Sequence, residues 1–268
     1  MSKLIILKLG GSVITAKQSG KPMLRTRFVR RLAEEIAEWY SAAPFKKRTR
    51  LVLLYGAGSF GHPLAHRYRL QDKDLDAEDL IGVGRTIAAM RELGTRLADI
   101  FLDAGIPIIP LQTSSFVQKK KDHVVCKDYS LIEDILRAGG VPFFGGDVVI
   151  ADGRRTAIAS ADTLAAALAA HFRARRILFA TDVGGVYRRF PPRRGERAFP
   201  VVHRKELQGM LKKRASDDSP LDVTGAMMGK LRALLPLRNC TVVIFDATKA
   251  GSLAEVLRNR KRGTIVAL

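Results

Sequence analysis

The stretch that decides the fold is LIILKLGGS, residues 4–12. Five of its first six residues are aliphatic, and two glycines follow the run at once. Such a run predicts a strand that is buried on both faces, as in a parallel sheet. The glycine pair predicts a tight turn whose backbone can approach an anion closely. The run is too short for a membrane span or a signal-peptide core.

Outward from this strand, short β-branched runs alternate with longer segments of helical period. Strands are predicted at 4–9, 50–55, 107–111, 141–144, 148–150, 176–180, 241–245 and 264–267. Helices are predicted at 26–42, 77–104, 129–138, 161–171, 205–213, 224–235 and 253–257. This alternation indicates an α/β fold, a three-layer αβα open sandwich with a central, mainly parallel sheet. We expect one continuous sheet with two functional halves.

Composition excludes several classes of protein. The chain has 268 residues, of which 47% are hydrophobic, so it can bury a core and is not disordered. Its two cysteines, Cys126 and Cys240, are far apart, which argues against a disulfide framework and a cysteine-rich zinc site. We therefore expect a cytoplasmic protein without metal-ligating residues of its own.

The charge is strongly basic. Lys and Arg number 46 against 26 Asp and Glu, a net charge of +20, and half of this excess lies within residues 173–214. Such an excess favours nucleic acid, an anionic membrane surface or phosphorylated small molecules as partners. Only Phe190 and Phe199 are aromatic in the arginine-rich loop after Tyr187, too few for base stacking. We interpret most of the charge as solvated surface.

Five loops suited to phosphate follow predicted strands or open predicted helices. They are residues 8–17, 56–62, 160–162, 181–187 and 222–230. Each alone has an ordinary interpretation as a tight turn or a helix start. Ligands of parallel α/β sheets bind at the carboxyl ends of the strands, however, so all five together predict one site for phosphorylated ligands.

Four side chains in these loops are candidates for chemistry. Lys8 and Lys17 add point charges on either side of the first glycine turn, although no Walker A motif is present. His62 falls in the first turn after the second loop, where it can donate to a phosphate oxygen or act as an acid–base group. Asp162 is either a functional carboxylate or a helix-start residue favoured by the helix dipole.

The loops resemble those of the amino acid kinase superfamily, and within it the isopentenyl phosphate kinases. The similar segments are KLGGSVITAK at 8–17, GAGSFGH at 56–62, GGDVV at 145–149, ATDVGGVY at 180–187 and DVTGAMMGK at 222–230. They occur in the same order and span nearly the whole chain. The first two are the most specific to the branch whose acceptor is a phosphate.

This resemblance implies a single domain over 1–268, with the acceptor bound mainly by residues of about 1–150 and ATP with Mg²⁺ mainly by about 151–268. The implied reaction converts isopentenyl phosphate and ATP into isopentenyl diphosphate and ADP. The family is usually homodimeric, and we expect neither a membrane nor a nucleic acid as partner. A fosfomycin kinase or other small-molecule kinase is the nearest alternative, and a non-catalytic nucleic-acid-binding protein is the more distant one.

The resemblance also implies residue roles. Lys8 would contact the transferred phosphoryl group, Lys17 would stabilise the transition state, His62 would hold the acceptor phosphate, and Asp162 would orient the two lysines. The nucleotide would be bound by Lys8, Gly10, Gly11, Ser12, Gly58, Asp182, Tyr187, Ala226 and Lys230, and the acceptor by Ala57, His62 and Ala161.

Alanine replaces the family's usual glycine at Ala57, Ala161 and Ala226. Alanine is tolerated where φ is negative and costs on the order of 1 kcal/mol where φ is positive. The isoprenoid tail has candidate contacts at Ile81, Val83, Ile87 and Met90, which core packing explains equally well.

Overall fold

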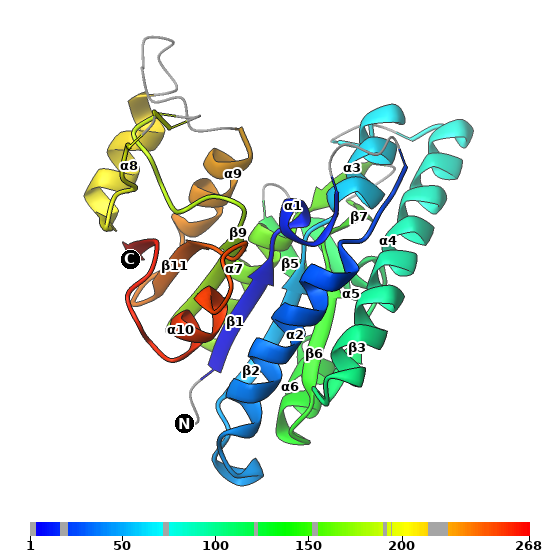
Figure 1. Ribbon diagram of the computed structural model, residues 1–268. Coiled ribbons are helices and arrows are strands. Elements are labelled where there is room, and N and C mark those ends of the chain that lie inside the picture. The colour runs from blue at the N-terminus through cyan, green and yellow to red at the C-terminus, as the bar shows by residue number, and fades with distance from the viewer. Residues whose placement is uncertain are drawn as a thin grey trace.

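The computed structural model describes residues 4–16, 21–71, 75–120, 123–151, 155–189, 192–193, 195–213 and 225–268. Within them, eight strands form the central sheet (Figure 1): β1 (Leu4–Leu9), β2 (Arg50–Tyr55), β3 (Ile108–Pro110), β6 (Val141–Gly145), β9 (Arg176–Thr181), β10 (Val201–His203), β11 (Thr241–Asp246) and β12 (Thr264–Ala267). Their order is β10-β12-β11-β9-β1-β2-β6-β3. Neighbours are parallel except β11 and β12, so the predicted mainly parallel sheet is confirmed.

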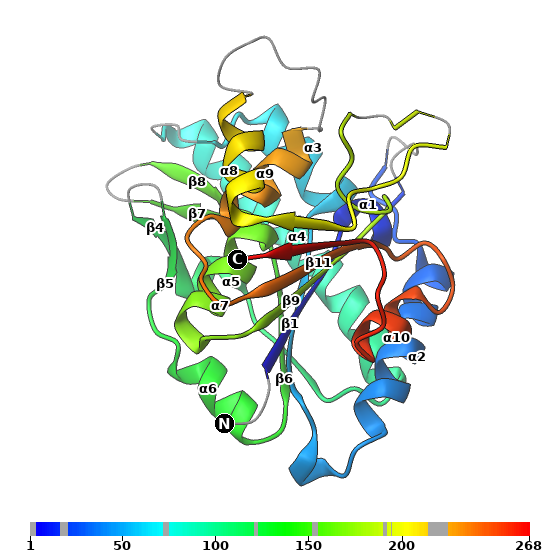
Figure 2. The same ribbon diagram turned by 90° about the vertical axis from the view of Figure 1, so that its left-hand side faces the viewer.

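Helices cover both faces of the sheet and make the three predicted layers (Figure 2). One face packs against α1 (Gly11–Ile14), α2 (Thr26–Ser41), α3 (Gly58–Arg67), α4 (Ala77–Asp103) and α10 (Ser252–Leu257). The opposite face packs against α5 (Thr113–Phe116), α6 (Ser130–Arg137), α7 (Ala161–Phe172), α8 (Arg204–Lys213) and α9 (Gly225–Leu234).

Alternation along β1 decides where its one charged residue lies. Leu4 and Ile6 belong to the core beneath α7, whereas Ile5 and Leu7 belong to the core beneath α2. Successive side chains of a strand point to opposite faces, so Lys8 lies on the same side as Leu4 and Ile6. The strand period therefore directs the lysine toward α7.

The predicted strands and helices are confirmed to within one residue at either end, but one expectation about the sheet was wrong. The predicted strand at 148–150 is β7 (Asp147–Ile150), which pairs with β8 (Thr156–Ala159) in a separate antiparallel hairpin. The dipeptide Asp152-Gly153 between these strands is a hairpin signal, and local antiparallel pairing needs no crossover. The sheet is thus not continuous through this segment.

A second hairpin joins β4 (Val117–Lys120) to β5 (His123–Cys126). The short helices α1 and α5 and the edge strand β10 were also not predicted, whereas α3 begins where the second loop was expected to lead into a helix. Of the described helices, none combines the length and the apolar character that crossing a membrane requires.

Candidate active site

A cleft of about 1350 Å³ opens at the carboxyl ends of the parallel strands. The turns after β1, β2 and β9 and the starts of α3 and α7 contribute to its walls. The predicted site residues that line it are Lys8, Gly10, Gly11, Ser12, Ala57, Gly58, His62, Ala161, Asp162, Asp182, Tyr187 and Lys230. Lys17 lies outside the described residues. Ala226 is the second residue of α9, and its side chain also lies outside them.

A buried cluster of three charged groups forms part of the cleft wall. Lys8 Nζ lies 2.9 Å from Asp162 Oδ1, and Lys230 Nζ donates a hydrogen bond to the same oxygen at 2.8 Å. Both lysines are almost fully buried, at 7% and 5% exposed. The Lys230 ammonium also lies 4.4 Å from the centre of the Phe179 ring. The second lysine on Asp162 is therefore Lys230, among the residues that the structure describes.

Local geometry explains how these three groups meet. Asp162 is the second residue of α7, whose first turn is capped by Ser160: the Ser160 hydroxyl accepts the Thr163 amide at 3.1 Å. Lys8 lies on the face of β1 that points toward α7, and the residue beside it on the adjacent strand β9 is Phe179. The helix α9 packs against α7 and brings Lys230 over that ring.

The charges in this cluster shift one another's pKa values. Burial by itself would raise the pKa of the Asp162 carboxyl, but the Lys8 and Lys230 ammonium groups outweigh it and hold this pKa well below its usual range. Burial, followed by the Lys8 charge, lowers the pKa of Lys230 to about 8 against the opposing effect of Asp162. Two ammonium groups on one carboxylate leave a net positive charge, which suits a phosphate anion.

Two glycine turns pack back to back beside the cluster. A Cβ on Gly11 would lie 2.4 Å from Gly58 N, and one on Gly56 would lie 2.7 Å from Gly11 N. Gly58 has φ +50°, which favours glycine. The absent side chains therefore let the β1 and β2 turns touch, a requirement that the sequence did not reveal.

The alanines at two positions of close approach are compatible with the backbone. Ala57 has φ −67° and ψ −30° at the start of α3, and Ala161 is the first residue of α7. Neither residue has a positive φ. Both are accommodated without the strain that alanine meets at positive φ.

His62 lies on α3 with its side chain exposed to the cleft. Partial loss of hydration between the cleft walls, followed by the Lys8 charge, lowers the pKa of its imidazole, and Asp162 opposes this shift. This shift favours the neutral imidazole, which can donate one hydrogen bond.

Beyond His62 the cleft has an apolar wall. Met90 lines it, together with Leu70, Val148 and Ile158. Of the other residues proposed for a tail pocket, Val83 is 5% exposed and packs with Leu70, Val148 and Ile87, whereas Ile81 is 57% exposed and points outward.

The loop of residues 181–187 forms another part of the cleft wall. Thr181, Asp182, Val183, Gly185 and Tyr187 line the cleft there. The Thr181 hydroxyl donates to the Val183 carbonyl at 2.8 Å and so fixes the first turn of the loop.

Sequence reasoning missed two residues that hold the turns. The Thr15 hydroxyl donates to the Gly11 carbonyl at 2.8 Å and accepts the Ser59 amide at 3.0 Å, so it joins the first glycine turn to α3. Asp147 accepts a hydrogen bond from Gln112 at 2.7 Å while only 5% exposed. Both residues lie within or beside the quoted motifs, but ordinary hydroxyls and carboxylates carry no signal of long-range partners.

Parallel strands that end on touching glycine turns, with buried lysines beside a wide cleft, define a class of protein that handles phosphate groups. A sequence model of the amino acid kinase family matches residues 3–246, and the chain belongs to this family. The family predicted from the motifs is thereby confirmed.

Isopentenyl phosphate kinases are among the curated relatives that resemble this chain over nearly its whole length. That of Methanothermobacter thermautotrophicus is 36% identical in an alignment 272 positions long, which covers 97% of this chain and 98% of the relative. That of Methanocaldococcus jannaschii is 30% identical over 266 residues, 97% of each chain. A solved X-ray structure of an isopentenyl phosphate kinase is 31% identical, with a TM-score of 0.81 over 98% of this chain and 99% of that one.

Proposed function

We propose that this protein transfers the γ-phosphoryl group of ATP to isopentenyl phosphate, with isopentenyl diphosphate and ADP as products. The observation that carries the proposal is the buried Lys8–Asp162–Lys230 cluster, which lines the same cleft as His62 and the 181–187 loop. The isopentenyl phosphate kinases similar to the chain over 97% of its length support the choice of acceptor.

Charge is the central difficulty of this reaction, because both substrates are polyanions. Phosphoryl transfer depends mainly on positioning and on neutralising the charge that develops on the moving group. In our proposal Lys8 contacts the transferred group, Lys17 stabilises the transition state, and Asp162 keeps Lys8 oriented. No strong general base is needed, because the acceptor phosphate is already an anion at pH 7.

The donor side is assigned to the turns and helices around the 181–187 loop. Amides at glycine turns and helix starts are unused by the helix itself and attract phosphate oxygens. The residues proposed to bind ATP are Lys8, Gly10, Gly11, Ser12, Gly58, Asp182, Tyr187, Ala226 and Lys230.

The acceptor side is assigned to the start of α3. His62 donates to the acceptor phosphate, and the amides of Ala57 and Ala161 lie at helix starts from which they can assist. The apolar wall of Leu70, Met90, Val148 and Ile158 then takes the five-carbon tail.

Mg²⁺ is the expected companion of ATP, and the side chains present fit a metal that is held by the nucleotide. Among the described residues no three His, Cys, Asp or Glu side chains are grouped as metal ligands. Mg²⁺ keeps several waters and commonly binds through substrate phosphates with few protein carboxylates. In this proposal the nucleotide phosphates and waters would hold the metal, which would neutralise phosphate charge.

The two halves of the chain divide the work in this proposal. His62, Ala57 and most of the apolar wall come from residues 1–150, which we assign mainly to the acceptor. The 181–187 loop and α9 come from residues 151–268, which we assign mainly to ATP. Lys8 and Asp162 belong to different halves, so their contact lies where the two substrates meet.

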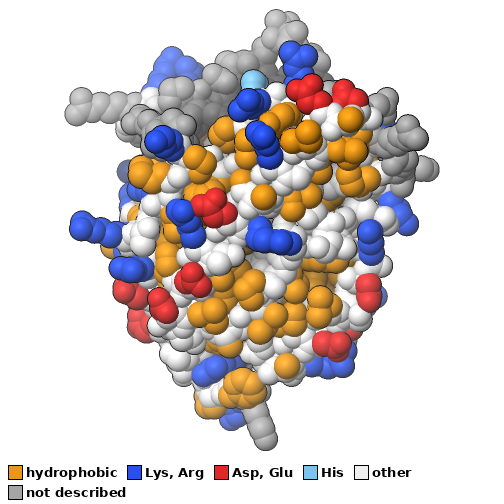
Figure 3. Space-filling view, turned by 90° about the vertical axis from the view of Figure 1, so that its right-hand side faces the viewer, with side chains coloured by type: hydrophobic (Ala, Val, Ile, Leu, Met, Phe, Trp, Pro, Cys, Tyr) orange, Lys and Arg blue, Asp and Glu red, His pale blue; other side chains and the backbone are white. Residues whose placement is uncertain are grey.

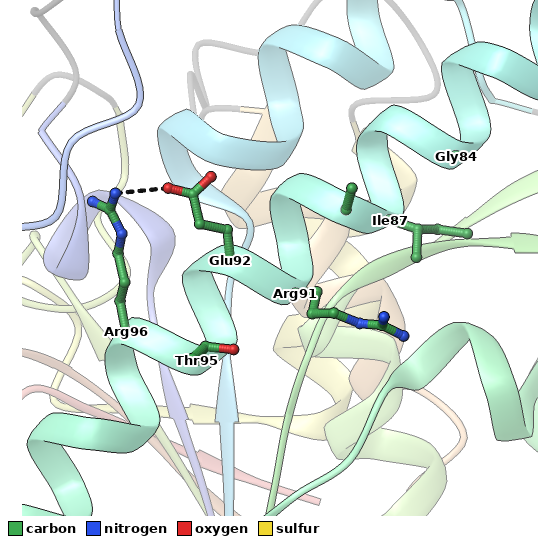
Figure 4. Close-up of a pocket in the computed structure, with 7 residues that line it drawn as sticks. Gly84, Ile87, Arg91, Glu92, Thr95 and Arg96 are labelled. Atoms are coloured by element: carbon green, nitrogen blue, oxygen red, sulfur yellow. Dashed lines mark ion pairs between the residues drawn. The ribbon is translucent and has the colours of Figure 1, made fainter.

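A homodimer is the proposed assembly, and it would use the outer face of α4 with the edge strand β3. Leu80 and Ile81 on α4 and Ile109 on β3 are 55%, 57% and 43% exposed, and apolar side chains gather on this side of the molecule (Figure 3). A shallow groove of about 520 Å³ between Gly84 and Arg96 lies on the same helix (Figure 4). Sedimentation of Ile81→Arg should show a monomer, while Leu131→Arg, exposed on the opposite layer, should remain dimeric.

One coupled ADP-release assay tests the activity. Isopentenyl phosphate, dimethylallyl phosphate, longer prenyl phosphates and fosfomycin are each offered with Mg·ATP. We expect the highest kcat/KM with isopentenyl phosphate. A higher value with fosfomycin would assign a different acceptor to the same fold, and no turnover with the whole panel would overturn the proposal.

A further inference from the structure

Thr264, on β12, ties the cleft loop to the strand beyond it. Its side chain is fully buried, at 0% exposed. Its hydroxyl oxygen accepts the Val186 amide at 2.8 Å and donates to the Phe199 carbonyl at 2.6 Å. The Phe199 amide in turn donates to the Val186 carbonyl at 2.8 Å. One hydroxyl therefore closes a ring of hydrogen bonds between residues about 80 positions apart in the chain.

The loop is also pressed against this hydroxyl. Gly185 has φ +147°, and a Cβ there would lie 2.4 Å from Thr264 Oγ1. Gly185 and Tyr187 line the cleft on either side of the buried Val186. The contact with Thr264 consequently sets how far this part of the loop reaches into the cleft.

Thr181 and Thr264 hold opposite ends of the loop. The Thr181 hydroxyl fixes its beginning through the Val183 carbonyl, and Thr264 fixes its end through the Val186 amide. A hydroxyl accepts and donates strongly at one small atom. An isosteric valine would leave the buried Val186 amide and the partly buried Phe199 carbonyl without this partner, and a buried donor that loses its hydrogen bond is costly.

We propose that Thr264 is a positioning residue for the nucleotide: it touches no substrate but holds the 181–187 loop in the shape that binds ATP. This inference rests on the proposed assignment of that loop to ATP. It predicts a selective effect, in which nucleotide affinity depends on the Thr264 hydroxyl and acceptor affinity does not.

The test compares Thr264→Val and Thr264→Ser with the unaltered protein. Mg·ATP affinity is measured by calorimetry without acceptor, and KM for each substrate is measured with isopentenyl phosphate. Thr264→Val should weaken ATP binding and raise KM for ATP about tenfold, with kcat and KM for the acceptor changed less than about twofold. Thr264→Ser should restore ATP binding to within about threefold, because serine keeps the hydroxyl.

A matched control exists in the same fold. Thr156 is also 0% exposed, but its hydroxyl has no hydrogen-bond partner among the described residues. Thr156→Val should leave ATP binding unchanged. If Thr264→Val does not fold, Gly185→Ala disturbs the same contact from the loop side and should weaken ATP binding similarly.

Each outcome is decisive. Unchanged ATP affinity in Thr264→Val, an equal rise in both KM values, or failure of Thr264→Ser to restore binding would overturn the positioning role. Tight ATP binding without turnover of isopentenyl phosphate would contradict only the proposed acceptor. The role of Thr264 would still be tested, because the calorimetric comparison is made without any acceptor. Absence of ATP binding by the unaltered protein would overturn both proposals.

Discussion

Lys230 Nζ donates a hydrogen bond to Asp162 Oδ1 at 2.8 Å across 68 positions of the chain. This bond joins α9 to the start of α7 at the point where Lys8 contacts the same oxygen. A carboxylate between two buried ammonium groups keeps their mutual repulsion from opening the cleft wall.

Removing this carboxylate charge should damage both stability and catalysis. Asp162→Asn leaves two ammonium groups facing each other without a counter-charge, which should lower the free energy of unfolding by about 3–5 kcal/mol. We also expect kcat to fall on the order of a hundredfold, because Lys8 loses its orientation. Denaturant unfolding and steady-state kinetics measure the two effects. Asp134 is exposed and belongs to a different ion pair, so it offers a control. Asp134→Asn should change neither the free energy of unfolding nor kcat.

The pH dependence of ATP capture should follow Lys230. Burial and then the Lys8 charge lower the pKa of Lys230 to about 8, so its cation is present below that pH and is lost as pH rises through it. The ammonium form attracts phosphate, hence kcat/KM for ATP should fall about tenfold per pH unit on the alkaline side. Lys230→Arg stays charged and should shift this limb to higher pH. If kcat/KM for ATP falls at the same alkaline pH in both proteins, the titrating group is not Lys230.

His62 should discriminate between the two substrates. His62→Ala removes the imidazole donor at the acceptor end, so KM for isopentenyl phosphate should rise about tenfold or more while KM for ATP stays within about twofold. Steady-state kinetics with each substrate varied provides the comparison. The exposed His171 stacks on Tyr129 away from the cleft, and His171→Ala should behave as the unaltered protein. Near-native kcat and KM in His62→Ala would remove this residue from the acceptor site.

The contact between the glycine turns should be intolerant of a methyl group. A Cβ on Gly11 would lie 2.4 Å from Gly58 N, so Gly11→Ala should destabilise the fold by about 1–3 kcal/mol through backbone displacement. Gly209, within α8, has no atom within 4 Å of its would-be Cβ. Gly209→Ala should therefore raise stability by up to about 1 kcal/mol, because alanine favours the helix. Thermal and denaturant unfolding of both variants should give shifts of opposite sign.

The basic excess should appear in the kinetics of ATP capture. Arg189 lines the cleft within the basic stretch of 173–214, and such charge raises the local concentration of an anion. We expect kcat/KM for ATP to fall several-fold between low and high salt, and less steeply in Arg189→Gln. The control Arg137→Gln removes a charge at the end of α6, distant from the cleft. If kcat/KM for ATP depends equally on salt concentration in all three proteins, the arginines serve only to make the surface soluble.

The sequence by itself determined the layered α/β fold and indicated most of the loops that line the cleft. Apolar runs such as residues 4–9 have enough local information to specify strands, and glycines after them specify turns. The order of the motifs then indicated the family, and the alternation of β1 already directed Lys8 to one face. These features depend on residues near one another in the chain, so local patterns suffice to predict them.

Only the tertiary structure decided which distant groups share an atom. The pairing of Lys230 with Asp162, the touching of Gly11 and Gly58 and the Thr264 anchor each join segments separated by tens of residues. The departure of β7 into its own hairpin likewise depended on competition between local and long-range pairing. Such contacts follow from how the whole sheet and its helices pack, and packing geometry is not encoded in any single stretch of the sequence.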